Sequence, residues 1–153
     1  MKKIKNSILF ITLSSALLFS IFFPKNIFDV IGKDIHTVPI THLTIHHKDF
    51  ISHGGHTLES SNISDVERLV TFFKNYKVVR VPIYNYKDYD HKEIYSITFT
   101  TDTNSLIRIS TSDDGHVFLT NKYGSYGLYK FANKKLDIPY LNQFYNSLLI
   151  LNI

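Results

Sequence analysis

The sequence contains no cysteine and no tryptophan among its 153 residues. Without cysteine, the chain has no disulfide framework, no thiol nucleophile and no thiolate ligand for a metal ion. Its stability must therefore come from packing. The 12 phenylalanines and 10 tyrosines supply aromatic area for a packed core.

Excess charge is also scarce once the first few residues are set aside. The chain carries 17 basic and 13 acidic residues, and three of the lysines are Lys2, Lys3 and Lys5. The rest of the chain is almost neutral. A nearly neutral domain offers no broad basic surface for a phosphate backbone, so we exclude nucleic-acid binding.

Catalytic signatures are missing as well. Ser125 stands between Gly124 and Tyr126, which does not match the G-x-S-x-G spacing of a nucleophile elbow. Only three glutamates are present, and paired aspartates at 113–114 are better explained by turn chemistry than by glycoside hydrolysis. The sequence predicts no catalytic residues, and an enzyme is the less favoured interpretation.

What the sequence does contain is an uncharged apolar run from Ile8 to Phe23. Its Leu, Ile and Phe residues favour transfer into a bilayer and outweigh the few Ser and Thr residues. Three lysines precede the run, and Lys25 alone directly follows it. The positive-inside rule then predicts a cytoplasmic N-terminus, a membrane helix and a domain on the far side of the cell membrane.

The length of this run does not decide whether the run is cleaved from the mature protein. A signal peptide has an apolar region of ~7–15 residues, whereas a spanning helix needs roughly 17–25. The run has no pair of small residues near its end, so we favour an uncleaved signal anchor; cleavage would give a secreted protein. We therefore divide the chain into a signal anchor or signal peptide at 1–24, a tether at 25–39 and an extracytoplasmic domain at 40–153.

The rest of the chain alternates between strand and helix patterns. A capping box, Ser64-Asp65-Val66-Glu67, predicts that one helix starts at Ser64. A second helix is predicted to start at Asp137 or Ile138, with Pro139 in its first turn. Period-two alternation predicts strands at 40–47, 79–83, 94–100, 106–110, 117–120 and 126–131, and Asp114-Gly115 predicts a tight hairpin.

We therefore predict an α+β fold. It has one mostly antiparallel sheet of about five to six strands, covered on one face by two helices, after an N-terminal membrane helix. The part from Ile40 to Leu149 resembles a family of small exported α+β domains of unknown function in Bacillota. The resemblance rests on the first strand, the helix at Ser64, the strand from Ile94 to Thr100, the Asp-Gly hairpin, the Tyr126-x-x-Tyr129 strand and the Leu136-Asp137 helix start. It implies an extracytoplasmic domain and no catalytic residues.

Histidines cluster early in this domain. His46 lies on a predicted strand, and His53 and His56 flank the turn at Gly54-Gly55. Imidazoles that converge across a hairpin are typical ligands of zinc or copper. We therefore keep a metal site at His46, His53 and His56, in an exported and possibly hydrolytic domain, as the alternative function. A polar strand face beside a solvated turn explains the same residues.

Tyrosines gather in two predicted loops. Tyr84, Tyr86 and Tyr89 lie in one, and Tyr123 and Tyr126 flank Gly124-Ser125 in the other. Tyrosine gives large, stiff, amphipathic contact area and is enriched in binding loops, although rings that cap a sheet edge give the same pattern. We therefore predict a membrane-tethered or secreted interaction module that binds a protein or an envelope component, of the inhibitor, immunity or sensor type.

Overall fold

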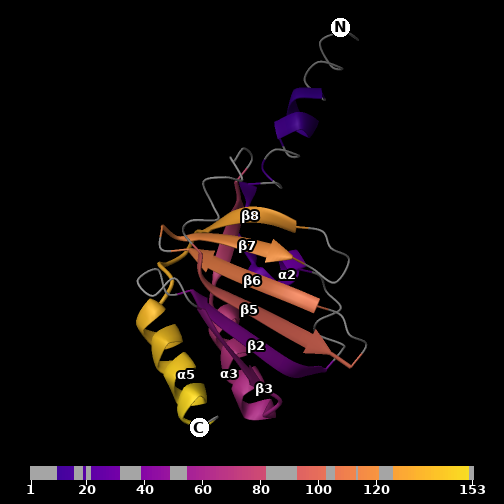
Figure 1. The fold of residues 1–153 in the computed structure, drawn as a ribbon. Helices are drawn as coiled ribbons and strands as arrows, with labels where there is room; N and C mark the ends of the chain where they lie inside the picture. Colours follow the sequence, from indigo (N-terminus) through magenta and orange to yellow (C-terminus); the bar gives the residue numbers. More distant parts are fainter. Residues whose placement is uncertain are drawn as a thin grey trace, which may run out of the picture.

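A computed structural model of the chain describes residues 10–15, 19, 22–31, 39–48, 55–81, 93–102, 106–112, 114–120 and 126–151. Figure 1 shows a sheet with helices packed behind it and the N-terminal segment extending away from one end of the domain. In chain order the elements are β1 (Lys25–Asn26), α2 (Ile27–Ile31), β2 (Ile40–Lys48), β3 (Gly55–Ser60), α3 (Ile63–Lys74), β4 (Lys77–Arg80), β5 (Glu93–Thr101), β6 (Leu106–Ser112), β7 (His116–Thr120), β8 (Tyr126–Phe131) and α5 (Ile138–Leu151).

The strands form one antiparallel sheet of eight strands in the order β1-β4-β8-β7-β6-β5-β2-β3. Strands β5 to β8 are a sequential meander. The β2-β3 hairpin extends the sheet beyond β5, while β4 and then β1 extend it beyond β8. The predicted count of five to six strands is therefore wrong. The prediction did not include β1, which is too short to show a period of two. It also did not include β3 as a full strand, because its segment follows the Gly54-Gly55 turn signal.

The predicted fold class also included an N-terminal membrane helix. Helical residues in the described part of the apolar run are 10–15, 19 and 22. In the portions of the chain that the structure describes, no helix is long and apolar enough to cross a bilayer.

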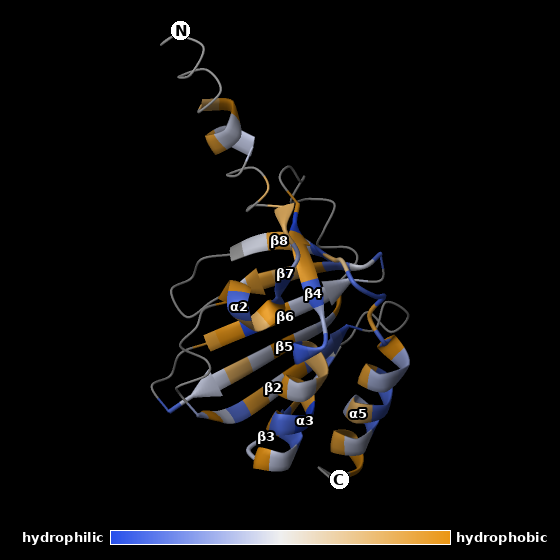
Figure 2. Cartoon of the chain, turned by 180° about the vertical axis from the view of Figure 1, so that it is seen from behind, coloured by the Kyte–Doolittle hydropathy of each residue, from blue (hydrophilic) through white to orange (hydrophobic). Residues whose placement is uncertain are grey.

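All three labelled helices pack against the same face of the sheet, as Figure 2 shows from behind. On β2, Leu43 and Ile45 point into this layer and are fully buried, and Ile97 and Phe99 of β5 do the same. Successive strand side chains point to opposite faces, so each central strand gives alternate residues to the core. The other face bears polar side chains such as Thr44 and Thr98.

The chain immediately after the apolar run belongs to this domain. Lys25 pairs with Val78 in β4, and the Asn26 side-chain amide donates a hydrogen bond of 2.6 Å to the Lys74 carbonyl. In α2, Phe28 is 1% exposed and its ring lies 6.4 Å from the Phe99 ring. Residues 25–31, predicted to be part of a tether, thus belong to the folded domain, and Ile27, Phe28 and Ile31 are buried in its core.

The start of α3 differs from the predicted capping box. Asn62 is the N-cap residue, and its side-chain oxygen accepts a hydrogen bond of 2.9 Å from the Ser64 backbone N–H. The Ser64 hydroxyl forms no hydrogen bond with any described residue. Asn and Ser are nearly equal as caps, so the local sequence gave no reason to prefer Asn62. The capping-box prediction is wrong by two residues.

Replacement of the true cap should destabilise the protein, and replacement of the predicted cap should not. We expect Asn62→Ala to lower the free energy of unfolding by about 1 kcal/mol, because the Ser64 N–H loses its acceptor. The matched control is Ser64→Ala, which should change it by less than about 0.5 kcal/mol. Urea denaturation measures both values, and a larger loss for Ser64→Ala would contradict this assignment.

Buried tyrosines connect α5 to the rest of the domain. The Asp137 backbone N–H donates to the Tyr76 hydroxyl (3.0 Å), and the Tyr95 hydroxyl donates to the Asn142 side chain of α5. The Tyr145 hydroxyl donates to the His56 carbonyl of β3 (3.2 Å). Burial disfavours the phenolate and raises the pKa of Tyr95 to about 12. These rings are core residues with a satisfied hydroxyl group.

The Tyr95 hydroxyl should make the folded state sensitive to alkali. In the unfolded chain tyrosine ionises near pH 10, whereas in the folded state Tyr95 does so at about 12. Its contribution to stability is therefore complete below pH 10 and is lost as the pH rises to about 12, by up to about 2–3 kcal/mol. The unfolding free energy of Tyr95→Phe should fall less steeply over this range. Equal slopes for the two proteins would contradict the shift.

Candidate functional site

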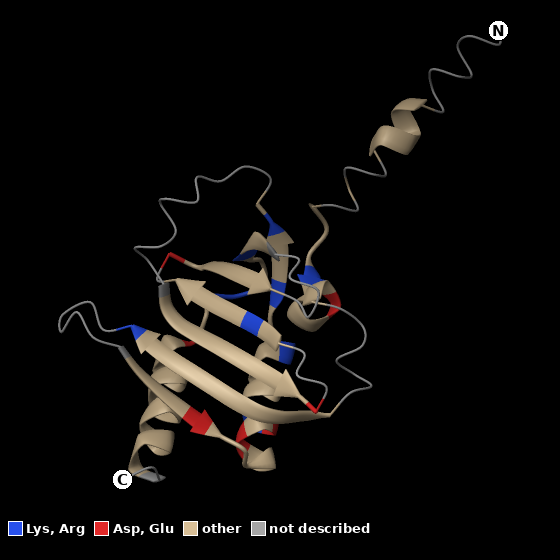
Figure 3. Cartoon of the chain, turned by 45° about the vertical axis from the view of Figure 1, so that its right-hand side comes forward, with Lys and Arg blue, Asp and Glu red and all other residues tan. Residues whose placement is uncertain are grey.

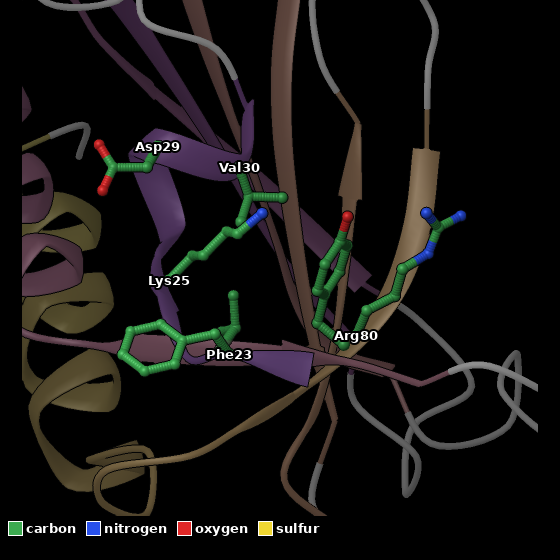
Figure 4. A pocket seen from close by; sticks show the side chains of 7 residues that line it. Phe23, Lys25, Asp29, Val30 and Arg80 are labelled. Carbon is green, nitrogen blue, oxygen red and sulfur yellow. The ribbon is translucent and has the colours of Figure 1, made fainter. Parts of the chain in front are cut away.

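A cavity of about 250 Å³ opens where β1, β4, β8 and α2 meet. It lies at the point where the apolar run enters the folded domain, and Figure 4 shows it from close by. Its lining combines two cations, one carboxylate, two aromatic rings and two valines. The residues are Phe23, Lys25, Asp29, Val30, Val78, Arg80 and Tyr129.

The register of the sheet brings one wall of this cavity together. Lys25 pairs with Val78, and Arg80 pairs with Tyr129. Paired residues share a face in an antiparallel sheet, and so do residues two apart on one strand. The side chains of Lys25, Val78, Arg80 and Tyr129 therefore all project to the face that the helices cover. Val78 is 1% exposed and forms an apolar floor beneath the two cations.

The opposite wall comes from α2. Its buried residues anchor the helix in the core and leave Asp29 exposed and Val30 partly buried at the cavity. In Figure 4 the Lys25 ammonium group approaches Val30, whereas the Asp29 carboxylate points away from both cations. Asp29 forms no ion pair with either of them within the described structure.

The two cations come from diagonal positions of the β1–β4 pair, and neither has a counterion among the described residues. Lys25 pairs with Val78, and Arg80 lies two residues after Val78, so Lys25 and Arg80 are diagonal neighbours. The backbones of such neighbours lie roughly 7–8 Å apart. Neither side chain forms an ion pair with a described residue. Both are exposed at the mouth of the cavity. Two cations against one carboxylate leave the lining with a net positive charge, which favours an anionic ligand.

The ring of Tyr129 occupies space that a side chain at position 127 would fill. A Cβ atom at position 127 would lie 2.9 Å from the Tyr129 ring carbon Cε2 and 3.2 Å from its hydroxyl oxygen. The absence of a side chain at Gly127 therefore lets the Tyr129 ring lie back along β8. A Gly127→Ala substitution would displace this ring from the cavity wall without a change of charge.

The predicted metal ligands do not face one another in the described structure. His46 pairs with Thr57, and its Nδ1 lies 3.0 Å from the Thr57 hydroxyl oxygen. His56 is the neighbour of Thr57 and pairs with His47, so it projects to the opposite face of the sheet. His53 lies outside the described residues. In the described ranges no group of three His, Cys, Asp or Glu side chains is placed to hold a metal ion, and zinc or copper binding stays a prediction.

The predicted tyrosine surface falls mostly outside the described residues. Tyr84, Tyr86, Tyr89 and Tyr123 all lie there. Tyr126 is the first residue of β8 and pairs with Thr120 of β7, while its side chain is not described. A role for these loops in binding stays a prediction.

A second, more open cavity of about 460 Å³ lies along α3 and reaches Tyr140 of α5. The Phe72 and Tyr140 rings stack there, 4.5 Å apart. Its arginine, Arg68, is already engaged with the Asp65 carboxylate at 3.7 Å and with the face of the Phe144 ring. We therefore favour the Lys25–Arg80 cavity as the candidate site.

Sequence reasoning missed this site. It counted Lys25 only for the orientation of the apolar run, and Arg80 lay within a predicted strand. These two residues are far apart in the chain, so no local motif connects them. A faint signal was the placement of Arg80 two residues after the apolar Val78, on the same strand face.

No family model, no curated protein and no solved structure matches this chain. The resemblance to small exported domains of Bacillota therefore stays a prediction.

Neutralising the two cations should not harm folding. We expect Lys25→Gln and Arg80→Gln each to change the free energy of unfolding by less than about 0.5 kcal/mol, because each charge is exposed and unpaired within the described structure. A substitution in the floor, Val78→Ala, should cost about 1.5 kcal/mol or more, because it removes buried methyl groups. Thermal or urea unfolding measures all three values. A loss above about 1 kcal/mol for either charge variant would show that the cation is structural.

Proposed function

We propose that this protein is a binding module of the cell envelope, targeted to the membrane by residues 8–23, with the Lys25–Arg80 cavity as its ligand site. The observation that supports the proposal most is the pair of cations over an apolar floor, without a counterion in the described structure. Binding sites of small domains combine an apolar surface with a few fixed polar groups in this way.

The chemistry of the cavity favours binding over catalysis. Its lining offers an ammonium, a guanidinium, a phenol, one carboxylate, and aromatic or aliphatic surface. The two cations outnumber the carboxylate. These groups recognise an anion and its attached apolar part. The described lining contains no histidine, serine or threonine, and its one carboxylate, on Asp29, points away from both cations (Figure 4). The activity that fits is capture of a ligand or partner.

The position of the cavity fits a site at the membrane surface. Only Pro24 separates the end of the apolar run, at Phe23, from Lys25. Lysines at positions 2, 3 and 5 support an orientation with the domain outside the cytoplasm. An uncleaved run would hold the cavity against the bilayer, and a cleaved one would release the domain as a secreted protein. An inhibitor, immunity or sensor role is compatible with either form.

Targeting should fail when the apolar run is interrupted. We expect Leu13→Arg to abolish export, because one arginine at the centre of a spanning segment costs ~2.5 kcal/mol or more. Ile63→Arg on α3 is the matched control, since Ile63 is also exposed in the described structure and gains the same charge. Alkaline phosphatase fused to the C-terminus of the full chain measures export, because this enzyme is active only outside the cytoplasm.

Cell fractionation shows whether the fusion protein is in the membrane or in the medium. Sequencing of its mature N-terminus shows whether the apolar run is cleaved. Enzyme activity for the wild type and the control, together with none for Leu13→Arg, supports the proposal. A fusion that is inactive with the wild-type chain would refute an extracytoplasmic location.

A further inference from the structure

We infer that the Lys25–Arg80 cavity binds a phosphate group, and that the phosphate belongs to a lipid headgroup at the surface of the membrane. The inference rests on the proposed function, since it names the ligand of that site. A lipid phosphodiester and a free phosphate share this chemistry, and the experiment below separates the two sources.

The lining of the cavity supplies hydrogen-bond donors and positive charge that suit a phosphate group. The guanidinium of Arg80 presents paired N–H groups that match two oxygens of one phosphate, and the ammonium of Lys25 adds a compact charge to the lining of the same cavity. Tyr129 adds a hydroxyl at the same wall, because it pairs with Arg80 across the sheet. A phosphate would give both cations the counterion that no described residue provides.

The position of Lys25 in the chain limits how far it can lie from the hydrocarbon core of the membrane. Lys25 lies two residues after Phe23, and an extended chain reaches at most ~3.6 Å per residue, so the ammonium-bearing residue starts within about 7 Å of the last apolar residue. The polar layer on each side of a bilayer core is ~5–8 Å thick. If the apolar run ends at the hydrocarbon boundary, Lys25 falls within the layer of lipid phosphates.

Charge is unevenly distributed over the domain, which gives it a partial electrostatic polarity (Figure 3). Figure 3 shows several basic residues near the end where the N-terminal segment enters, together with an acidic residue on α2, and acidic residues on β3 and α3 farther from this end. Lys77 and Lys130 are exposed on β4 and β8, close to the cavity strands, whereas Glu59 and Glu67 are exposed on β3 and α3. Basic residues near a membrane surface are attracted to anionic lipids, so this polarity would turn the cavity toward the bilayer.

Exposed phenylalanine rings at the cavity offer a contact surface for the acyl part of a lipid. Phe22 and Phe23 are 43% and 55% exposed in the described structure. Phenylalanine on the apolar side of a surface segment is typical of the boundary between headgroups and acyl chains. The acyl part of a lipid would then lie along these rings, while its phosphate faces the two cations.

The experiment uses the full chain in maltoside micelles, which contain no phosphate. Because the chain has no tryptophan, Phe23→Trp provides a single fluorescent reporter at the cavity. One arm titrates dihexanoyl phosphatidylglycerol against dihexanoylglycerol, its phosphate-free counterpart. The other arm titrates inorganic phosphate against chloride at equal ionic strength. The double substitution Lys25→Gln/Arg80→Gln, made in the Phe23→Trp protein, tests whether binding occurs at the cavity.

The matched control is Lys74→Gln/Arg108→Gln, which removes the same charge from exposed positions outside the cavity. We expect saturable binding of phosphatidylglycerol that weakens at least ~tenfold in the cavity variant and less than ~threefold in the control. Gly127→Ala, which displaces Tyr129, should weaken it by an intermediate factor. Circular dichroism confirms that each variant is folded.

Each outcome decides between the two sources or rejects both. Cavity-dependent binding of phosphatidylglycerol but not of inorganic phosphate establishes the lipid source. Cavity-dependent binding of inorganic phosphate with equal affinity keeps the phosphate site and rejects its restriction to lipids. Equal affinities in the cavity and control variants, or equal responses to the phosphate-free lipid, overturn the inference. Failure of the export assay with cavity-dependent phosphate binding intact would refute only the proposed location.

Discussion

The pairing of β1 with β4 is the constraint on which the candidate site depends. Two residues of β1 align with Lys77 and Val78, and the Asn26 side chain fastens the segment to the Lys74 carbonyl at the end of α3. The Ile27 backbone N–H then reaches the Tyr76 carbonyl, and α2 continues into the core. The apolar run is thus joined to the sheet without a spacer, and the cavity forms at this junction.

The charges at the junction contribute little to the stability of the fold. On α3 the Arg68 guanidinium lies 3.7 Å from the Asp65 carboxylate. At the cavity Lys25 and Arg80 share a face with no such partner in the described residues. Natural proteins tolerate arrangements of this kind where function requires them, because stability is needed only above a threshold. An anionic ligand would remove the repulsion and couple binding to the order of β1 and α2.

Tyrosine has a different role in this structure from the one that composition suggests. Tyr76, Tyr95 and Tyr145 are buried, and their hydroxyl groups hold α5 and the segment before it against the sheet. A large ring with one polar atom suits a core in which helices must be placed over a sheet, because the ring supplies area and the hydroxyl fixes position. Binding by the tyrosines of the loops remains a separate prediction.

The sequence by itself determined the elements whose signals are local. Asp137 and Pro139 predicted a helix start that the structure has at Ile138, and Asp114-Gly115 predicted the hairpin in which Gly115 adopts a φ of 83°. Strand and helix periods are set by near neighbours, so these patterns can be read along the chain. The tertiary structure alone decided that β1 pairs with β4, that α2 enters the core and that Lys25 stands beside Arg80. Those contacts join residues far apart in sequence, and their energy comes from burial and cross-strand pairing that no local period records.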